Sequence, residues 1–408
     1  MIVAGAGAAG LIAAGYAAKQ GAEVTVLEKN KTVAKKIRIS GKGRCNLTNA
    51  GDLNAFIASY PGNGKFLYSA LNSFTNWDLL DLFHSLGVET KTERGDRIFP
   101  VSDDANQIAD ALYQFVTKKG VMIRYNTPVS KLLTSKHSIK GVKFLNGELE
   151  ADSVIVTTGG ASYPRTGSNG DGYALAKAVG HTIRPIIPAL VPLRTKEPWV
   201  QEISGLSLRN VAVTVGNGTT EQSLFGEMQF AHFGVTGPIV LTLSRQVGMW
   251  LRENSQEIRM TIDLKPALSR ETLDARVRQD FQHYARKQLC NGLNDLLPRS
   301  LIPILIQLSG ISPEKKINQI SRQERSQLVQ VLKALPLTIT STLPIAAAIV
   351  TAGGIDVTEV NPKTMESKYI KGLYFAGEVL DIDGITGGFN LQAAFSTGYL
   401  AGIHGGKG

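Results

Sequence analysis

Cysteine is scarce in this sequence of 408 residues, which contains only Cys45 and Cys290. Two cysteines exclude a disulfide framework and a zinc knuckle and fit a reducing compartment, so we expect a soluble cytoplasmic protein. No group of residues has metal-ligand spacing, and no metal is expected. Long hydrophobic runs are also missing, since the apolar run at 344–350 is too short to span a bilayer. We therefore expect no membrane partner.

Compact runs of basic residues are missing as well, although the chain is basic overall. It has 44 Lys and Arg against 34 Asp and Glu, a net charge of +10. Such a surface favours anionic partners, which include a nucleotide cofactor, an acidic substrate, RNA and membrane phosphates, or it serves solubility alone. Without basic runs, nucleic acid is the less expected partner, and a small anionic molecule is the more expected one.

Glycine is plentiful, with 42 residues, and its first cluster is Gly5, Gly7 and Gly10, between an apolar strand and a helix of small apolar residues. Glycines at this spacing permit a tight turn and let backbone N–H groups approach a pyrophosphate at the helix N-terminus. A second predicted strand ends at Glu28, 18 residues after Gly10, where a carboxylate can accept both ribose hydroxyls of an adenosine. The combination predicts dinucleotide binding rather than a glycine turn made only for packing.

A second glycine-bearing segment, residues 39–49, reads Ile-Ser-Gly-Lys-Gly-Arg-Cys-Asn-Leu-Thr-Asn. It resembles the bacterial family of BaiN/RdsA-type NAD(P)/FAD-dependent oxidoreductases, also described as aminoacetone oxidase-like flavoproteins, which is related to fumarate reductase flavoprotein subunits. The string from Gly43 to Asn49 is highly characteristic of that family. The resemblance continues at 61–64, 97–100, 158–164, 232–238, 377–381 and 386–390, and so covers nearly the whole chain. It implies an FAD-binding fold with hydride transfer at the flavin.

Two residues of this segment are candidates for chemistry beyond binding. Arg44 carries a fixed charge on a planar fork, which suits a carboxylate or a developing anion, and we expect it to be catalytic. The alternative for Arg44 is an ordinary structural ion pair. Cys45 could be a redox thiol, but no second cysteine is near it in sequence, and a buried thiol without a catalytic role is favoured.

The C-terminal part of the chain holds a third glycine-rich block. A predicted strand at 373–376 ends at Gly377-Glu378, and Gly387-Gly388 precede a predicted helix. In the flavoproteins that the sequence resembles, an acid at the position of Glu378 holds a hydroxyl of the ribityl chain. A helix N-terminus has free N–H groups and partial positive charge, which would stabilise an anionic reduced flavin. Two glycine clusters separated by the whole chain indicate FAD rather than NAD.

Shorter segments are consistent with the same FAD-binding fold, although each could equally be an ordinary turn. The resemblance places the backbone at Val129 against the adenine and the loop at 166–172 on the flavin side. It makes 351–354 the segment where the chain re-enters the flavin domain. The full set of expected cofactor-binding residues is Gly5, Gly7, Ala8, Ala9, Gly10, Glu28, Lys29, Ser40, Gly41, Gly43, Arg44, Cys45, Asn46, Val129, Thr158, Gly159, Gly160, Gly377, Glu378, Gly388, Asn390 and Leu391.

His232 is the histidine with a functional setting, because it precedes a loop that leads to a predicted helix start at Gly237-Pro238. A helix N-terminus with an adjacent histidine can bind or protonate an anionic substrate, so His232 is a second catalytic candidate. A hydrogen-bonded structural histidine is the alternative.

The predicted fold class is α/β, a three-layer Rossmann-type FAD-binding domain with an inserted β-barrel-like domain and a helical insert. We expect the FAD domain at 1–190 with 341–408, the β-rich insert at 191–268 with about 335–340, and the helical insert at 269–334. Within the helical insert, Ser312-Pro313 and the Ser321–Glu324 spacing each predict a helix start.

The leading interpretation is an FAD-dependent oxidoreductase that acts on a small anionic metabolite, with hydride transfer to or from the flavin N5 and the direction left open. One rival is a flavin-dependent tRNA-modifying or RNA-binding protein, which a continuous basic face would favour. Another is an NAD-dependent dehydrogenase, which the C-terminal block argues against. No second Gly-x-Gly-x-x-Gly motif follows a strand, so NAD(P)H is expected only as a transient electron donor.

Overall fold

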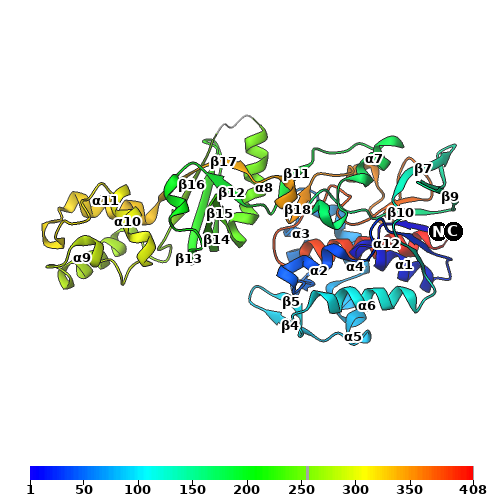
Figure 1. Cartoon of the computed structure of the whole chain (residues 1–408), viewed down its shortest axis with the longest axis horizontal. Coiled ribbons are helices and arrows are strands. Elements are labelled where there is room, and N and C mark those ends of the chain that lie inside the picture. Colours follow the sequence, from blue (N-terminus) through cyan, green and yellow to red (C-terminus); the bar gives the residue numbers. More distant parts are fainter. Residues whose placement is uncertain (254–256, 408) are drawn as a thin grey trace. The chain divides into compact units, whose positions relative to one another are not determined.

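The computed structural model describes residues 1–253 and 257–407. The chain forms two compact units, one of residues 1–188 and 345–408 and the other of residues 189–344 (Figure 1). The first unit takes both ends of the sequence, and the second is one continuous stretch. The barrel and the helical segment that the sequence patterns separate lie in the same unit.

The first unit is built on a five-stranded parallel sheet in the order β19–β10–β1–β2–β6. Strands β1, β10 and β19 are short, apolar and wholly buried, which suits a parallel sheet covered on both faces. This arrangement confirms the Rossmann-type prediction. The strands are β1 (Ile2–Ala4), β2 (Thr25–Leu27), β6 (Met122–Arg124), β10 (Val154–Val156) and β19 (Leu373–Phe375).

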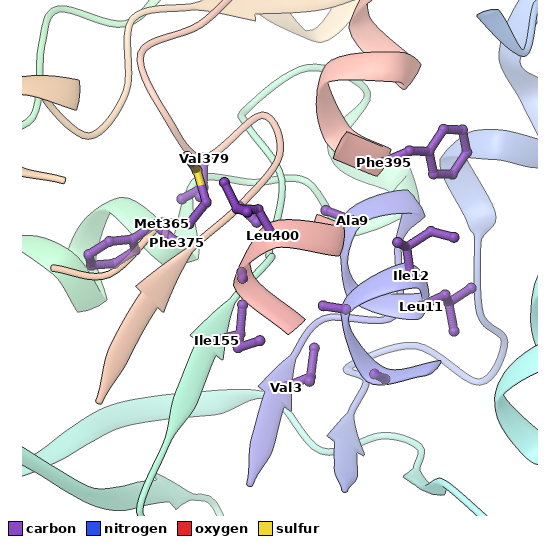
Figure 2. Packing of buried hydrophobic residues seen from close by; sticks show 14 of the residues in the cluster. Val3, Ala9, Leu11, Ile12, Ile155, Met365, Phe375, Val379, Phe395 and Leu400 are labelled. Carbon is purple, nitrogen blue, oxygen red and sulfur yellow. The ribbon is translucent and has the colours of Figure 1, made fainter. Parts of the chain in front are cut away.

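Two helices from opposite ends of the chain, α1 (Ala8–Lys19) and α12 (Phe389–Gly405), pack against each other in this unit. A Cβ on Gly398 or Gly402 of α12 would collide with the backbone of α1, so these glycines permit the close approach. The third helix of the layer, α6 (Ala105–Thr117), also packs on α1. Figure 2 shows apolar side chains of the sheet and of both terminal helices in one buried cluster, among them Val3, Ile155, Leu11, Ile12, Phe395 and Leu400.

The remaining elements of the first unit surround this core. A three-stranded antiparallel sheet has the order β3–β5–β4, and a second has the order β7–β8–β9. The elements are α2 (Lys35–Ile39), β3 (Thr48–Asn49), α3 (Leu53–Ala58), α4 (Tyr68–Ser73), α5 (Asn76–Ser85), β4 (Thr90–Glu93), β5 (Arg97–Pro100), β7 (Val129–Ser135), β8 (Ser138–Phe144), β9 (Gly147–Glu150), α7 (Asp171–Ala178), β11 (Ile187–Ala189) and β18 (Val350–Ala352).

The second unit contains a closed six-stranded barrel in the order β12–β15–β14–β13–β16–β17, with helix α8 (Pro238–Arg252) packed on it (Figure 1). Helix α8 begins at Pro238, as the Gly-Pro pair predicts. The strands are β12 (Leu193–Thr195), β13 (Ser207–Gly216), β14 (Glu221–Ala231), β15 (Gly234–Thr236), β16 (Ile258–Asp263) and β17 (Leu335–Thr342).

The helical segment of this unit contains α9 (Arg270–His283), α10 (Ile302–Leu308) and α11 (Arg322–Lys333). Ser321 caps α11 and forms a reciprocal capping box with Glu324, which confirms that predicted helix start. Helices α9 and α11 pack against each other and share one apolar core with the barrel.

Sequence patterns fail at two places in the second unit. They miss β14, because its first part is exposed or half-exposed on both faces and only Met228 and Phe230 near its end are buried. The helix start predicted at Ser312-Pro313 is wrong. The segment forms a turn, in which Lys315 N donates to Ser312 O at 3.1 Å, and the extended conformation of Lys316 stops a helix from propagating.

Candidate functional site

The turn before α1 has the three glycines in three different environments. A Cβ on Gly5, whose φ is +106°, would lie 2.7 Å from Thr157 O, and one on Gly10 would collide with Gly5 O. A Cβ on Gly7 would have no protein atom within 4 Å. Helix α1 has neither a side-chain cap nor an acidic residue in its first turn. The turn therefore presents an open helix N-terminus, which is the chemistry that a pyrophosphate needs.

Glu28 lies at the end of β2 and is buried, with 7% of its surface exposed. Its Oε2 accepts from Ala6 N at 2.8 Å, and its Oε1 accepts from Asn30 N at 2.7 Å. The backbone N–H of Thr127 donates to Glu28 O at 2.9 Å, which holds the segment leading into Val129 beside the acid. Glycine turn, acid and the 127–129 segment are thus brought together, as an adenosine site requires.

Residues 40–46 form a tight loop with several left-handed conformations. Gly41 and Gly43 have φ values of +56° and +84°, and Cys45 adopts +58° although it is not glycine. Ser40 O accepts from Cys45 N at 3.0 Å and closes the loop, while Ser40 Oγ donates to Ile37 O at 2.7 Å. The strained backbone is thus fixed by its own hydrogen bonds.

The residues that follow this loop attach it to the start of α12. The Asn46 amide, oriented to satisfy its neighbours, accepts from Gly388 N at 3.0 Å. Thr48 Oγ1 donates to the buried Gln392 Oε1 at 2.6 Å, and Asn49 Nδ2 donates to Gly387 O at 3.1 Å. The string that is most characteristic in the sequence therefore braces the C-terminal helix from a distance of more than 300 residues in sequence.

The N-terminus of α12 is uncapped by side chains and has no acid in its first turn, like that of α1. Gly388, with φ +96°, is packed so closely on Thr48 that a Cβ would collide with its carbonyl oxygen. The Asn390 amide accepts from Gly384 N and donates to Gly384 O, both at 2.8 Å, so it closes the preceding loop. Leu391 is half-buried in the first turn.

Glu378 is held by a cation that the sequence did not indicate. Lys36 Nζ lies 2.6 Å from Glu378 Oε2 and 2.5 Å from Ser162 Oγ. Glu378 Oε1 accepts from Ser162 Oγ at 3.0 Å and from Thr351 N at 2.9 Å. A Cβ on Gly160 would lie 3.0 Å from the carboxyl carbon of Glu378, so the 158–162 loop passes directly over this acid. Lys36 has no motif around it that could have revealed this partner.

Two expected contact residues have polar partners in the chain. Lys29 Nζ contacts both Asp171 Oδ2 and Asn169 Oδ1 at 2.6 Å, which joins β2 to the loop before α7. Arg44 pairs with Glu93 and Asp103 and lies over the Phe99 ring, 4.3 Å from its centroid. These geometries correspond to the structural ion pair that was the alternative for Arg44.

The ion pairs of Arg44 shift the pKa values of all three groups. The hydrogen bond from Arg44 lowers the pKa of Glu93, and those from Lys91 and then Arg44 lower the pKa of Asp103. The hydrogen bond to Glu93, followed by that to Asp103, raises the pKa of Arg44. The guanidinium is compensated by two carboxylates at the protein surface.

Cys45 is fully buried, and burial raises its pKa to about 12. A thiol in this setting stays protonated at neutral pH and is a poor nucleophile. The structure therefore gives the buried thiol that the sequence favoured. Cys290 is half-buried in the helical segment of the second unit.

Two buried hydroxyls in the first unit have no hydrogen-bond partner among the described residues, Thr158 Oγ1 and the Tyr173 hydroxyl. Burial, with Glu378 and Asp381 nearby, raises the pKa of Tyr173, so its hydroxyl keeps a proton to donate. Buried polar groups normally have partners, and a polar ligand would satisfy these two hydroxyls. Together with the open space at Gly7, they show that the residues fit an FAD molecule.

His232 lies between β14 and β15, is exposed, and packs edge-to-face on Phe233 with 5.0 Å between ring centroids. A different histidine, His181, is buried and bonded at both nitrogens, to Glu359 Oε2 at 3.1 Å and Ser367 Oγ at 2.8 Å. Burial lowers the pKa of His181, so it is a neutral internal tie and not a site residue.

Comparison with known proteins decides the family. The model of the HI0933-like protein Rossmann domain matches residues 1–404. The chain belongs to this family, which confirms the resemblance seen in the sequence. A 3-dehydro-bile acid Δ(4,6)-reductase of Clostridium scindens is 36% identical over 98% of this chain and 97% of its own length. A ribosomal RNA dihydrouridine synthase of Haemophilus influenzae is 33% identical over 98% of this chain and 97% of its own length.

A solved structure shows the same fold at lower identity. An open conformation of a flavocytochrome c3 fumarate reductase aligns with all of this chain and 78% of its own, with a TM-score of 0.54 and 17% identity. Family and fold make this HI0933-like chain an FAD-dependent oxidoreductase. Within the described residues, the structure contains no helix with the length and apolarity of a membrane span, and no group of residues suited to a metal ion.

Proposed function

We propose that this chain uses FAD to reduce a carbon–carbon double bond conjugated to a carbonyl group. The observation that carries the proposal is that two relatives aligned over almost the whole chain are named for such reactions. The Δ4,6 system of a 3-dehydro-bile acid and the C5–C6 double bond of a uridine are both conjugated to a carbonyl. Reduction adds hydride to the carbon β to the carbonyl and a proton to the carbon α to it, and reduced FAD supplies the hydride.

The proposed cofactor contacts follow from the open and unpaired groups of the first unit. The α1 N-terminus at Gly7 would hold the pyrophosphate, and Glu28 the adenosine ribose, with the backbone at Val129 beside the adenine. The unpartnered hydroxyls of Thr158 and Tyr173 would donate to polar atoms of the cofactor. These assignments rest on the fold and on the geometry of the uncapped helix N-terminus, the buried acid and the unpartnered hydroxyls.

The remaining contacts lie at the C-terminal block and the 40–46 loop. We propose that the α12 N-terminus at Gly388 faces the flavin, where its positive potential favours the reduced, anionic ring. Glu378, with its charge balanced by Lys36, would orient the loop at 158–162 through its contact with Ser162. The backbone of residues 40–46 would pass beside the ring, as its left-handed glycines allow.

Two side chains are proposed on the substrate side of the reaction. His232 is exposed and is our candidate for the group that protonates the carbon α to the carbonyl. Arg44 is already compensated by Glu93 and Asp103, so we propose that it positions the 40–46 loop and takes no proton or hydride. The electron donor would be NAD(P)H, bound transiently through scattered basic residues, with binding that is weak and salt-sensitive.

Anaerobic flavin spectroscopy tests this reaction class. The purified protein is reduced with NADH, and a 4-en-3-one steroid, fumarate or a uridine-containing RNA is then added in separate samples. We expect at least one conjugated acceptor to restore the oxidised flavin band, with a saturated analogue of the same compound as the inactive control. Return of the band only with a disulfide or a simple ketone would contradict the proposal.

A variant separates the role of His232 from cofactor binding. His232→Ala should retain full FAD but slow reoxidation by the active acceptor by about 10²-fold or more, the usual worth of a general acid. The effect should shrink at lower pH, where water and buffer supply protons more readily. Equal losses of FAD content and of reoxidation rate would mean that His232 is structural.

A further inference from the structure

Half of the net charge of the chain lies in the helical segment of the second unit. Residues 269–334 contain eleven Lys and Arg against six Asp and Glu, which is +5 of the total of +10. Half of these carboxylates are already neutralised by partners inside the segment, and a surplus of exposed cations remains. The internal pairs are Asp274–Arg325, Asp280–Arg276 and Glu324–Lys315.

Three arginines gather around one carboxylate where α9 and α11 pack together. Arg325 binds Asp274 with two hydrogen bonds, of 2.7 Å from Nε and 3.2 Å from Nη2. Arg278 and Arg322 also contribute to the lowered pKa of Asp274, after the hydrogen bond from Arg325. Both are exposed, and neither has an ion-pair partner among the described carboxylates. Arg278 lies one turn after Asp274 on α9, and Arg322 lies one turn before Arg325 on α11, so the Asp274–Arg325 pair brings these two uncompensated guanidiniums to one surface.

The side chains around these arginines are polar. Gln279 and Gln282 of α9 and Gln323 and Gln327 of α11 are exposed. Among the exposed large hydrophobic residues that the structure describes, Leu308 alone belongs to residues 269–334. A helix that binds a membrane surface needs an apolar face to enter the acyl boundary, which this segment lacks. Arginines with neighbouring amides match the oxygens of a nucleic-acid backbone instead.

We propose that the exposed face of α9 and α11 carrying Arg278 and Arg322, here called the arginine face, docks the phosphate backbone of RNA. Planar guanidiniums can contact phosphate oxygens in pairs, and the glutamine amides can donate to phosphates or sugars between them. Because the charges come from two helices, no basic run marks them in the sequence. The docking surface does not depend on which double bond the flavin reduces.

Fluorescence anisotropy with a labelled RNA hairpin tests the arginine face on the full-length, FAD-loaded protein. Arg278→Glu/Arg322→Glu should weaken binding about tenfold or more at moderate salt, because reversal removes phosphate contacts and adds repulsion. The neutral variant Arg278→Gln/Arg322→Gln should make the slope of log Kd against log salt shallower by about 1.5, the loss of two phosphate contacts.

The matched control is Lys118→Glu/Lys140→Glu, which changes the charge equally at two exposed positions of the first unit. It should leave RNA affinity within about twofold of the parent protein if the contacts are local. Equal weakening by both double variants would overturn the proposal, because binding would then follow net charge alone. Tighter binding to phosphatidylserine vesicles than to RNA, lost in the arginine variants, would assign the face to a membrane instead.

The same variants separate this proposal from the proposed reaction. Flavin content and NADH-driven reduction of a small conjugated acceptor should not change in the arginine variants. RNA docking without any reduction of a double bond would preserve the arginine face and remove the proposed reaction. Reduction of a free enone with no RNA affinity in the parent protein would do the reverse.

Discussion

The two glycine turns of the first unit open helices α1 and α12 in the same way but rest on different supports. Both helix N-termini lack a side-chain cap and an acid. At α1, Gly10 packs on Gly5 of the same turn, Gly5 lies against Thr157 after β10, and Gly7 faces open space. At α12, Gly388 packs on Thr48, and the segment at 46–49 holds the turn from outside. The spacing of the α1 turn can therefore be predicted from neighbouring residues. The support of the α12 turn comes from a segment more than 300 residues away in sequence.

The largest expected effects come from substitutions in the α1 turn, which distinguish the glycine needed for packing from the glycine needed for FAD binding. Gly10→Ala places a Cβ against Gly5 O, and we expect it to lower the free energy of unfolding of the apoprotein by about 1–3 kcal/mol and to abolish FAD retention. Gly7→Ala has no protein atom to strike, so it should unfold like the parent protein yet lose FAD. Urea unfolding and flavin absorbance measure the two properties. Full FAD in Gly7→Ala would show that the pyrophosphate lies elsewhere.

The acid that follows the α1 turn should have the next largest effect. Glu28→Ala removes a charged acceptor, and we expect FAD binding to weaken by about 1.5–3 kcal/mol. Because Glu28 also accepts from Ala6 N and Asn30 N, some stability will be lost as well. Glu28→Gln keeps one acceptor and provides the control for that loss. FAD titration of each apoprotein gives the affinity, and an unchanged affinity in Glu28→Ala would remove it from the site.

A substitution at Thr48 tests the brace of the C-terminal turn. Thr48→Val keeps the shape but leaves Gln392 Oε1 without its donor, which should cost about 1–3 kcal/mol of unfolding free energy. If the brace orients α12 toward the flavin, the reduction potential of the bound FAD should also fall. Thr117→Val, which alters an exposed threonine whose hydroxyl bonds only within α6, is the control. A loss of stability with an unchanged potential would confine Thr48 to packing.

The smallest effect concerns Cys45, in the loop before the brace. Burial raises its folded pKa to about 12, above the ordinary value of about 8.5. The folded state therefore holds a proton that the unfolded state releases as the pH rises above about 8.5. The stability from the neutral thiol is complete below that pH and declines toward pH 12. Urea unfolding at pH 7 and pH 10 should show a steeper loss for the parent protein than for Cys45→Ala.

Alkylation provides an independent readout for the same thiol. At pH 8, iodoacetamide should modify the half-buried Cys290 and leave the native Cys45 unreacted, since only a thiolate reacts rapidly. Mass analysis of the modified peptides identifies the site. Rapid labelling of Cys45 in the folded, FAD-loaded protein would contradict both its burial and its raised pKa.

The sequence by itself determined the parts of this protein that depend on neighbouring residues. The glycine turn with Glu28 lies within one short strand–turn–helix–strand stretch, and its geometry follows from backbone sterics and spacing. The capping box of α11 and the proline start of α8 are equally local. The family string at 43–49 also marked a real element, although its role as a brace for α12 was not visible.

Only the tertiary structure decided which charges meet. Lys36 finds Glu378, Arg44 finds Glu93 and Asp103, and Arg278 joins Arg322 from another helix. Ion pairs between distant elements leave no period in the sequence, because their energy depends on distance in space and not on separation along the chain. Strand β14 was missed for a related reason, since its partners in the barrel bury only part of its length. Turns and helix caps follow from neighbouring residues and can be predicted from the sequence. Ion pairs between distant residues and the burial of a strand are determined only when the fold brings those groups together.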